Sequence, residues 1–356
     1  MKYKITISLR NKGRLNFTEQ APYFNSNGAT DTVSFVPERI EIVAERRKLF
    51  KEDDIFFNVQ NSLYNQMLKC LQIHYCFEGL QAGITSIKVE MFGLSKYPAT
   101  TRLFDDNFQP YPSFDAPIPF REDSLKQLLF EDGDSYVLRI IIGHWLSQGI
   151  STGRQRRLEC VWRTFEQLCN HMRHASPQQR SNIAQGLDLM VTHLIANPGN
   201  YIHTADTVKS ETVDSLRKLR WHDMIANNHS RPSGNSKKTY ENYKHRLIDP
   251  YTDQRVCSLM QDILVYRRRE LQNFGLYTDI CNDLTVKLAN PIINDIDVVA
   301  ILCYYAYYLR NRLFHGQTLV RVSIFDANQS DEMYIDNITL MLSTLTVELI
   351  NNYQAL

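Results

Sequence analysis

The sequence predicts an α+β fold in two parts, an N-terminal mixed α/β domain followed by a mostly α-helical bundle. Segments 3–9 and 86–91 alternate apolar and polar residues with period two, as half-buried strands do. Beyond residue 120, apolar residues recur instead with the 3.6-residue period of amphipathic helices. A chain of 356 residues is also long enough for two domains with sizeable cores.

The N-terminal domain is expected to span residues 1–120. Between its two strands, apolar residues recur at helical spacing, at Leu63, Met67, Leu71 and Tyr75. Five of the twelve prolines then fall within one short stretch, at Pro98, Pro110, Pro112, Pro117 and Pro119. Because proline interrupts helices and sheets, this stretch predicts a linker or a long ordered loop, and a domain boundary at 120/121.

The C-terminal domain is expected to span residues 121–356 and to consist mostly of helices. Helical apolar periods run through three stretches, 158–172, 256–264 and 335–349. The segment 298–313 is apolar on nearly all sides, which predicts a central, buried helix. Residues able to cap its start precede it or open it, at Asn294, Asp295 and Asp297.

Composition narrows the class of protein. The seven cysteines form no Cys-x-x-Cys pair and their number is odd, which argues against a disulfide framework or a zinc ribbon. We find no signal peptide and no apolar run of about eighteen residues, so we expect a cytoplasmic protein with no membrane partner. His171 and His174 lie three apart with no third ligand at usable spacing, and no metal or other cofactor is expected.

Charge gives no overall basic bias, because the formal net charge is +1. A nucleic-acid role therefore needs a local basic surface. The most basic stretch is 209–246, with nine Lys or Arg against four Asp or Glu. This stretch is expected either to guide RNA phosphates or to form a solvated loop between helices, and composition leaves both readings open.

An arginine and a histidine five residues apart close the apolar segment 298–313. This spacing occurs three times in the chain, at Arg139/His144, Arg217/His222 and Arg310/His315, so spacing alone does not choose among the pairs. Three features favour the last pair. Asn311 follows the arginine directly, a long apolar helix precedes the pair, and Gly316 allows the chain to turn away after the histidine.

Helical geometry predicts how these side chains meet. Asn311 and His315 are four residues apart and share one helical face. Arg310 and His315 differ by about 140° on an ideal helix, so they do not converge within one straight helix. Either the last turn opens at His315, or two copies of the helix meet around one cleft in a two-fold dimer.

The pattern Arg-Asn-x-x-x-His at 310–315, at the end of an apolar helix, resembles the motif of the HEPN superfamily of ribonucleases. An upstream amphipathic helix with Trp162, Phe165 and Glu166 is similar to the first helix of HEPN domains. The resemblance covers about residues 125–356, and the arrangement behind a variable N-terminal domain resembles bacterial anti-phage and abortive-infection proteins. Glu166 lies on an otherwise apolar helix face, and we expect it to be a buried polar partner of the active site.

The resemblance implies a metal-independent endoribonuclease that acts on RNA as a homodimer with a composite site. Arg310 would bind the phosphate and stabilise the transition state, His315 would be the general acid or base, and Asn311 would orient the histidine or contact the phosphate. The ribose 2′-OH would be the nucleophile, leaving a 2′,3′-cyclic phosphate. The residue chemistry agrees, because a histidine titrating near neutrality moves protons and a guanidinium neutralises phosphorane charge. Arg312 and Tyr308 are expected to contact the substrate.

Several alternatives stay open. Apart from the resemblance, Arg310 and His315 also fit a helix C-terminus whose dipole favours cations. A non-catalytic dimer that binds nucleic acid or protein is the second candidate function. Tyrosines 304, 305, 307 and 308 either stack bases or form core and dimer contacts. An active ribonuclease also needs control, for which the N-terminal domain as a sensor, a phage- or host-derived trigger, or an antitoxin is expected.

Overall fold

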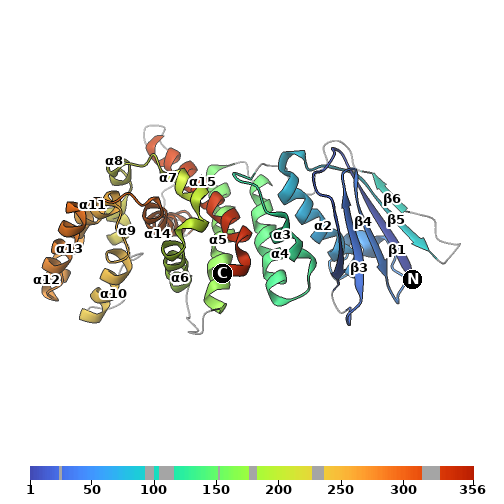
Figure 1. Cartoon of the computed structure of the whole chain (residues 1–356), viewed down its shortest axis with the longest axis horizontal. Helices are drawn as coiled ribbons and strands as arrows, with labels where there is room; N and C mark the ends of the chain where they lie inside the picture. The colour runs from blue at the N-terminus through green and yellow to red at the C-terminus, as the bar shows by residue number, and fades with distance from the viewer. Residues whose placement is uncertain are drawn as a thin grey trace. The chain divides into compact units, whose positions relative to one another are not determined.

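The computed structural model describes residues 1–23, 26–92, 100–103, 116–150, 153–175, 183–226, 236–314 and 329–356. An N-terminal antiparallel sheet is followed by a mostly helical region, which is the α+β layout that the sequence predicted (Figure 1). The chain divides into two compact units. The first contains Met1–Thr152 with Leu349–Ala355, and the second contains Gly153–Glu348 with Leu356.

The sheet of the first unit has six strands in the order β2-β3-β4-β1-β5-β6, and every neighbouring pair in the described part of the chain is antiparallel. The strands are β1 (Lys2–Leu9), β2 (Phe17–Pro22), β3 (Thr30–Val36), β4 (Arg39–Glu45), β5 (Ile84–Phe92) and β6 (Thr100–Leu103). Both predicted strands are confirmed as β1 and β5. They are neighbours in the sheet, with Ile5 opposite Val89.

One face of this sheet is buried, because every second residue along β1, at Tyr3, Ile5 and Ile7, is inaccessible to solvent. The helix that covers it, α2 (Ser62–Glu78), is the one predicted from the apolar spacing at 63–75 (Figure 1). The other helices of the unit are α1 (Glu52–Phe57), α3 (Glu122–Lys126) and α4 (Gly133–Leu146). Short 3₁₀ turns lie at Gly79–Gln81, Gln127–Leu129, Ser147–Ile150 and Tyr353–Ala355.

The boundary between the units lies at 152/153, later than the expected 120/121. Helix α4 packs against α2, and Gln72 Nε2 donates to the carbonyl of Arg139 at 3.1 Å, so α4 shares the core of the first unit. The end of the chain belongs to the same unit, and Asn351 Oδ1 accepts an exposed hydrogen bond from the backbone N–H of Arg121 at 2.8 Å. Most of the proline-rich stretch, 93–99 and 104–115, lies outside the described residues.

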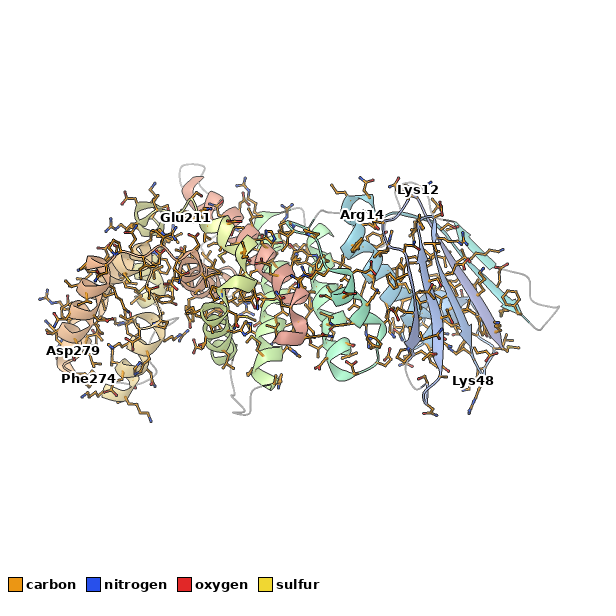
Figure 2. The ribbon with its side chains drawn as sticks, in the orientation of Figure 1. Lys12, Arg14, Lys48, Glu211, Phe274 and Asp279 are labelled. Atoms are coloured by element: carbon orange, nitrogen blue, oxygen red, sulfur yellow. The ribbon has the colours of Figure 1, made fainter. Side chains whose placement is uncertain are left out.

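The second unit is mostly helical in its described part. Its helices are α5 (Arg154–Ala175), α6 (Ile183–Ala196), α7 (Ile202–Val208), α8 (Val213–Arg217), α9 (Trp221–Ala226), α10 (Lys237–Leu247), α11 (Gln254–Ile263), α12 (Arg268–Asn273), α13 (Tyr277–Ala289), α14 (Asp295–Phe314) and α15 (Gln329–Asn351), whose last residues belong to the first unit. Short 3₁₀ turns lie at Pro198–Asn200 and Leu264–Arg267. Side chains fill the spaces between these helices, as where Phe274 stacks on Tyr240 with ring centroids 5.2 Å apart (Figure 2). No helix in the described ranges is both long and apolar enough to cross a bilayer.

Helix α14 is the central helix of this unit, as the sequence predicted. Residues 298–306 are all buried, and the helix packs against α5, α6, α7, α9 and α11. Asp297, in its first turn, accepts hydrogen bonds from the backbone N–H groups of Thr252 at 2.5 Å and Asp253 at 2.8 Å. Burial raises the pKa of Asp297, while these hydrogen bonds lower it. The start of α14 is thereby tied to the start of α11.

Candidate functional site

The last turn of α14 carries two of the three predicted catalytic residues. Arg310 and Asn311 are both helical, and Asn311 is buried whereas Arg310 is partly exposed. The third, His315, and the following Gly316 lie outside the described residues. The described part of the site is therefore the pair Arg310 and Asn311 with the side chains that surround it.

The guanidinium of Arg310 has two described partners. Its Nη1 donates to Asn311 Oδ1 at 2.9 Å, and its Nη2 lies 3.9 Å from Glu166 Oε2 on α5. The Glu166 side chain is 12 % exposed and that of Arg310 is 26 % exposed, so the pair lies near the surface but is largely shielded from water. Glu166 was expected to be a buried polar partner of the active site. It pairs with Arg310, but it is only partly buried.

Aromatic packing fixes this face of α14 against α5. Tyr307 precedes Arg310 by one turn, and its ring lies 5.8 Å from that of the buried Trp162. Trp162 in turn contacts Phe165 at 5.5 Å between ring centroids. The amphipathic period of α5 therefore supplies the apolar contacts that hold Glu166 within reach of Arg310.

The opposite face of α14 holds the two expected substrate contacts. Arg312 Nη1 donates to the hydroxyl of Tyr308 at 2.7 Å, and Tyr308 is fully buried. Of the two predicted roles for Tyr308, base stacking or a core contact, this burial favours the core contact, because its ring packs 5.6 Å from that of Tyr305. Tyr304 and Tyr305 are likewise buried. Arg312 is half-buried and remains a candidate for phosphate contact.

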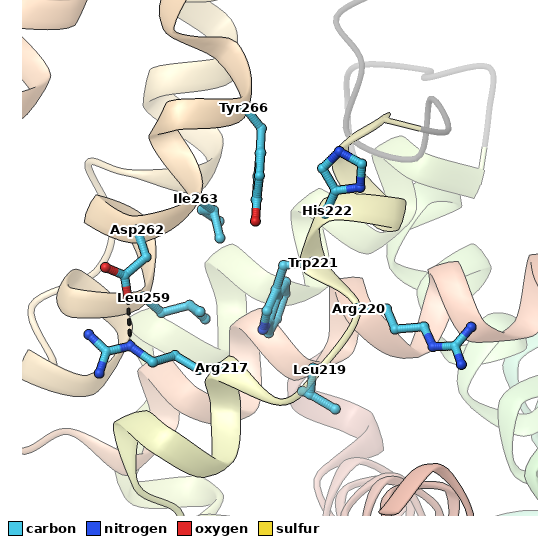
Figure 3. A pocket seen from close by; sticks show the side chains of 9 residues that line it. All are labelled: Arg217, Leu219, Arg220, Trp221, His222, Leu259, Asp262, Ile263 and Tyr266. Atoms are coloured by element: carbon cyan, nitrogen blue, oxygen red, sulfur yellow. Dashed lines mark hydrogen bonds and ion pairs between the residues drawn. The ribbon is translucent and has the colours of Figure 1, made fainter. Parts of the chain in front are cut away.

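The other two Arg/His pairs have different environments. Arg139 donates to the carbonyls of Leu128 at 3.1 Å and Phe130 at 2.5 Å, so it stabilises the turn before α4. Arg217 and His222, in contrast, line a cavity of ≈ 540 Å³ in the second unit (Figure 3). The sequence had favoured Arg310/His315 over this pair. The available signal was the aromatic Trp221 within the most basic stretch of the chain.

Within the described ranges, no three His, Cys, Asp or Glu side chains lie close enough together to bind one metal ion. The buried thiols of Cys169 and Cys303 have pKa values raised by burial, which favours the protonated form. These thiols belong to the core between α5 and α14.

Comparison with known protein families, with characterised proteins and with solved structures finds no match to this chain. The arrangement at the end of α14 therefore has to be interpreted from its own chemistry: a guanidinium, a buried amide and a carboxylate beside the sequence position of a histidine.

Proposed function

We propose that this chain is a metal-independent endoribonuclease of the HEPN type, with Arg310, Asn311 and His315 as its catalytic residues. The observation that carries the proposal is the position of Arg310. Its guanidinium lies at the end of a buried helix, held by Asn311 and Glu166, five residues before a histidine. A cation held in advance near a proton-transfer group is what phosphodiester transesterification requires.

The proposed reaction uses the RNA itself as nucleophile. His315 takes the proton of the ribose 2′-OH, and the 2′ oxygen attacks the adjacent phosphorus while the bond to the 5′ oxygen breaks. The 5′ oxygen receives a proton, from the same histidine or from His315 of a second copy, leaving a 2′,3′-cyclic phosphate and a 5′-OH. Arg310 neutralises the charge that develops on the phosphorane, and Asn311 orients the reacting groups.

A homodimer is part of this proposal. Arg310 and position 315 lie about 140° apart around an ideal helix, so one straight helix does not bring them together. Two copies related by a two-fold axis would place both sets around one cleft. The activity is further proposed to be controlled by a phage- or host-derived trigger or an antitoxin, with the N-terminal domain as the sensor.

The test is cleavage of RNA in excess chelator by the wild-type chain and by Arg310→Ala and His315→Ala. Each substitution is expected to lower the rate by roughly 10²- to 10⁴-fold, and the wild-type product is expected to carry a cyclic phosphate. Arg163→Ala and His174→Ala are matched controls, because both side chains are exposed on α5. Equal activity in all five proteins, or none in any, would contradict the assignment.

A second candidate is a non-catalytic dimer that binds nucleic acid or protein. The observation in its favour is Glu166, whose carboxylate lies 3.9 Å from Arg310 and competes with phosphate for the same cation. Binding of RNA by the wild-type chain, weakened by Arg310→Ala but never followed by product, would favour this module over the enzyme.

A further inference from the structure

A cavity of ≈ 540 Å³ lies between the segment 217–222 and the helix α11 with the turn that follows it (Figure 3). Its volume falls within the range of about 300–1,000 Å³ that is usual for small-ligand sites. Its floor is apolar and buried, formed by Trp221, Leu259 and Ile263. A ligand that buries a flat apolar surface against this floor would gain binding free energy from the hydrophobic effect.

The partly exposed side chain of Tyr266 forms an aromatic wall beside this floor. Tyr266 is 44 % exposed although it lines the cavity. Its centroid lies 4.7 Å from that of His222, with the planes at 75°. Figure 3 shows Tyr266 directed toward Trp221 across the opening. Such a wall and floor are suited to stacking a planar ring.

Positive charge flanks the floor. Arg217 and Arg220 extend to opposite sides of Trp221 (Figure 3). Arg217 donates hydrogen bonds from Nε to Asp262 Oδ2 at 2.6 Å and from Nη1 to Asp214 Oδ1 at 3.2 Å. These two carboxylates use two of its five N–H donors. Guanidinium groups therefore lie on both sides of the floor, where their N–H groups can donate hydrogen bonds to an anion.

We propose that this cavity binds a nucleotide, with the base between Tyr266 and Trp221 and the phosphate at the flanking arginines. A nucleotide joins a planar, largely apolar ring to an anion, which are the two features that the cavity complements. The nucleotide is either one unit of an RNA strand or a free molecule. Arginines on both sides of the stacking floor match the phosphates that flank each base within a strand.

The cavity packs against the helix that carries Arg310. The Trp221 ring lies 5.0 Å from that of Tyr305 on α14, and the backbone N–H of Arg220 donates to the Tyr305 hydroxyl at 3.1 Å. A nucleotide bound here would therefore lie against the central helix of the unit. Binding in the cavity does not depend on cleavage at Arg310, so the two proposals can fail separately.

The test is isothermal titration calorimetry of the full chain. The probes are the four ribonucleoside 5′-monophosphates, inorganic phosphate, and a 2′-O-methylated RNA oligomer that has no free 2′-OH to attack. The variants are Tyr266→Ala and Arg217→Ala. Tyr136→Ala and Arg163→Ala are matched controls: Tyr136 is an exposed tyrosine 5.8 Å from an arginine, and Arg163 is an exposed arginine in an ion pair.

We expect at least one monophosphate or the oligomer to bind, and Tyr266→Ala and Arg217→Ala each to weaken that binding by about tenfold or more. The controls should bind as the wild type does. An oligomer that binds more tightly than any monophosphate identifies an RNA strand, and equal affinities identify a free nucleotide. Absence of binding, binding unchanged in both variants, or phosphate alone binding as tightly as the best nucleotide would overturn the proposal. If Arg310→Ala loses RNA cleavage but still binds the nucleotide, the nucleotide-binding proposal is supported independently of the catalytic one.

Discussion

Arg310 of α14 and Glu166 of α5 form an ion pair across two packed helices, with 3.9 Å between Nη2 and Oε2. The distance is at the upper limit for such a pair, and both groups retain some exposure, so its contribution to stability is small, about 0–1 kcal/mol. Its effect on function is larger, because the carboxylate neutralises part of the charge that Arg310 would offer to a phosphate. The pair links the first helix of the second unit to the proposed catalytic turn.

Glu166→Gln should tighten RNA binding by the proposed ribonuclease. Removing the negative charge while keeping the side-chain shape leaves more of the Arg310 charge for the phosphate, so KM should fall roughly three- to tenfold with little change in kcat. Steady-state cleavage kinetics measure this. Glu159→Gln is the control, because Glu159 pairs with the exposed Arg163 on the same helix. A rise in KM with a fall in kcat would show instead that Glu166 positions Arg310.

Gly186→Ala should destabilise the second unit although alanine is the better helix former. A Cβ at Gly186 of α6 would lie 2.8 Å from the backbone oxygen of Cys169, so α5 and α6 would have to separate. We expect a loss of about 1–3 kcal/mol in the free energy of unfolding. Gly143→Ala in α4 is the matched control, because its Cβ would meet only Gln72 Nε2 at 3.7 Å. Urea unfolding should show the control unchanged or up to about 1 kcal/mol more stable, and equal losses in both variants would contradict the packing argument.

Arg255→Met should cost far more stability than the same change at Arg163. The buried Arg255 bonds Asp253 through Nη2 at 2.8 Å and Asp295 at 2.6 Å, so its loss leaves a buried carboxylate uncompensated. We expect a loss of about 3–5 kcal/mol. Arg163→Met removes an exposed pair and should cost about 0–1 kcal/mol. Denaturant unfolding of the two variants side by side measures the difference, and similar values would show that the buried network is not required.

Stability should fall as the pH drops from 7 to 5, partly through His74. Burial lowers the pKa of this histidine to about 4 from the usual 6.5. The unfolded chain therefore binds a proton in this range that the folded chain does not, and the stabilisation present above about pH 6.5 is lost as the pH falls toward 4. The expected loss between pH 7 and pH 5 is about 2 kcal/mol. In urea unfolding at several pH values, the His74→Gln variant should lose about this much less stability between pH 7 and pH 5 than the wild type. Identical pH profiles for the two proteins would refute the role of His74.

Much of the fold follows from local patterns. Alternation at 3–9 and 86–91 predicted β1 and β5, and the all-round apolar segment 298–313 predicted the buried helix α14. These predictions are correct because a period of two or 3.6 residues already determines which side chains share a face. The period does not predict which other segment of the chain packs against that face. The helix at Gly133–Leu146 therefore belongs with the sheet, while the prolines had suggested a boundary before it.

The sequence alone identified the motif of Arg310, Asn311 and His315 and marked Glu166 as its polar partner, because a charged residue on an apolar helix face needs a partner. Only the tertiary structure decided that this partner is Arg310 and that Tyr308 is core. It also showed that Arg217 and His222 line a cavity. The physical reason is that helical faces are set by residues three or four apart. Pairing and burial depend instead on contacts between segments far apart in the chain.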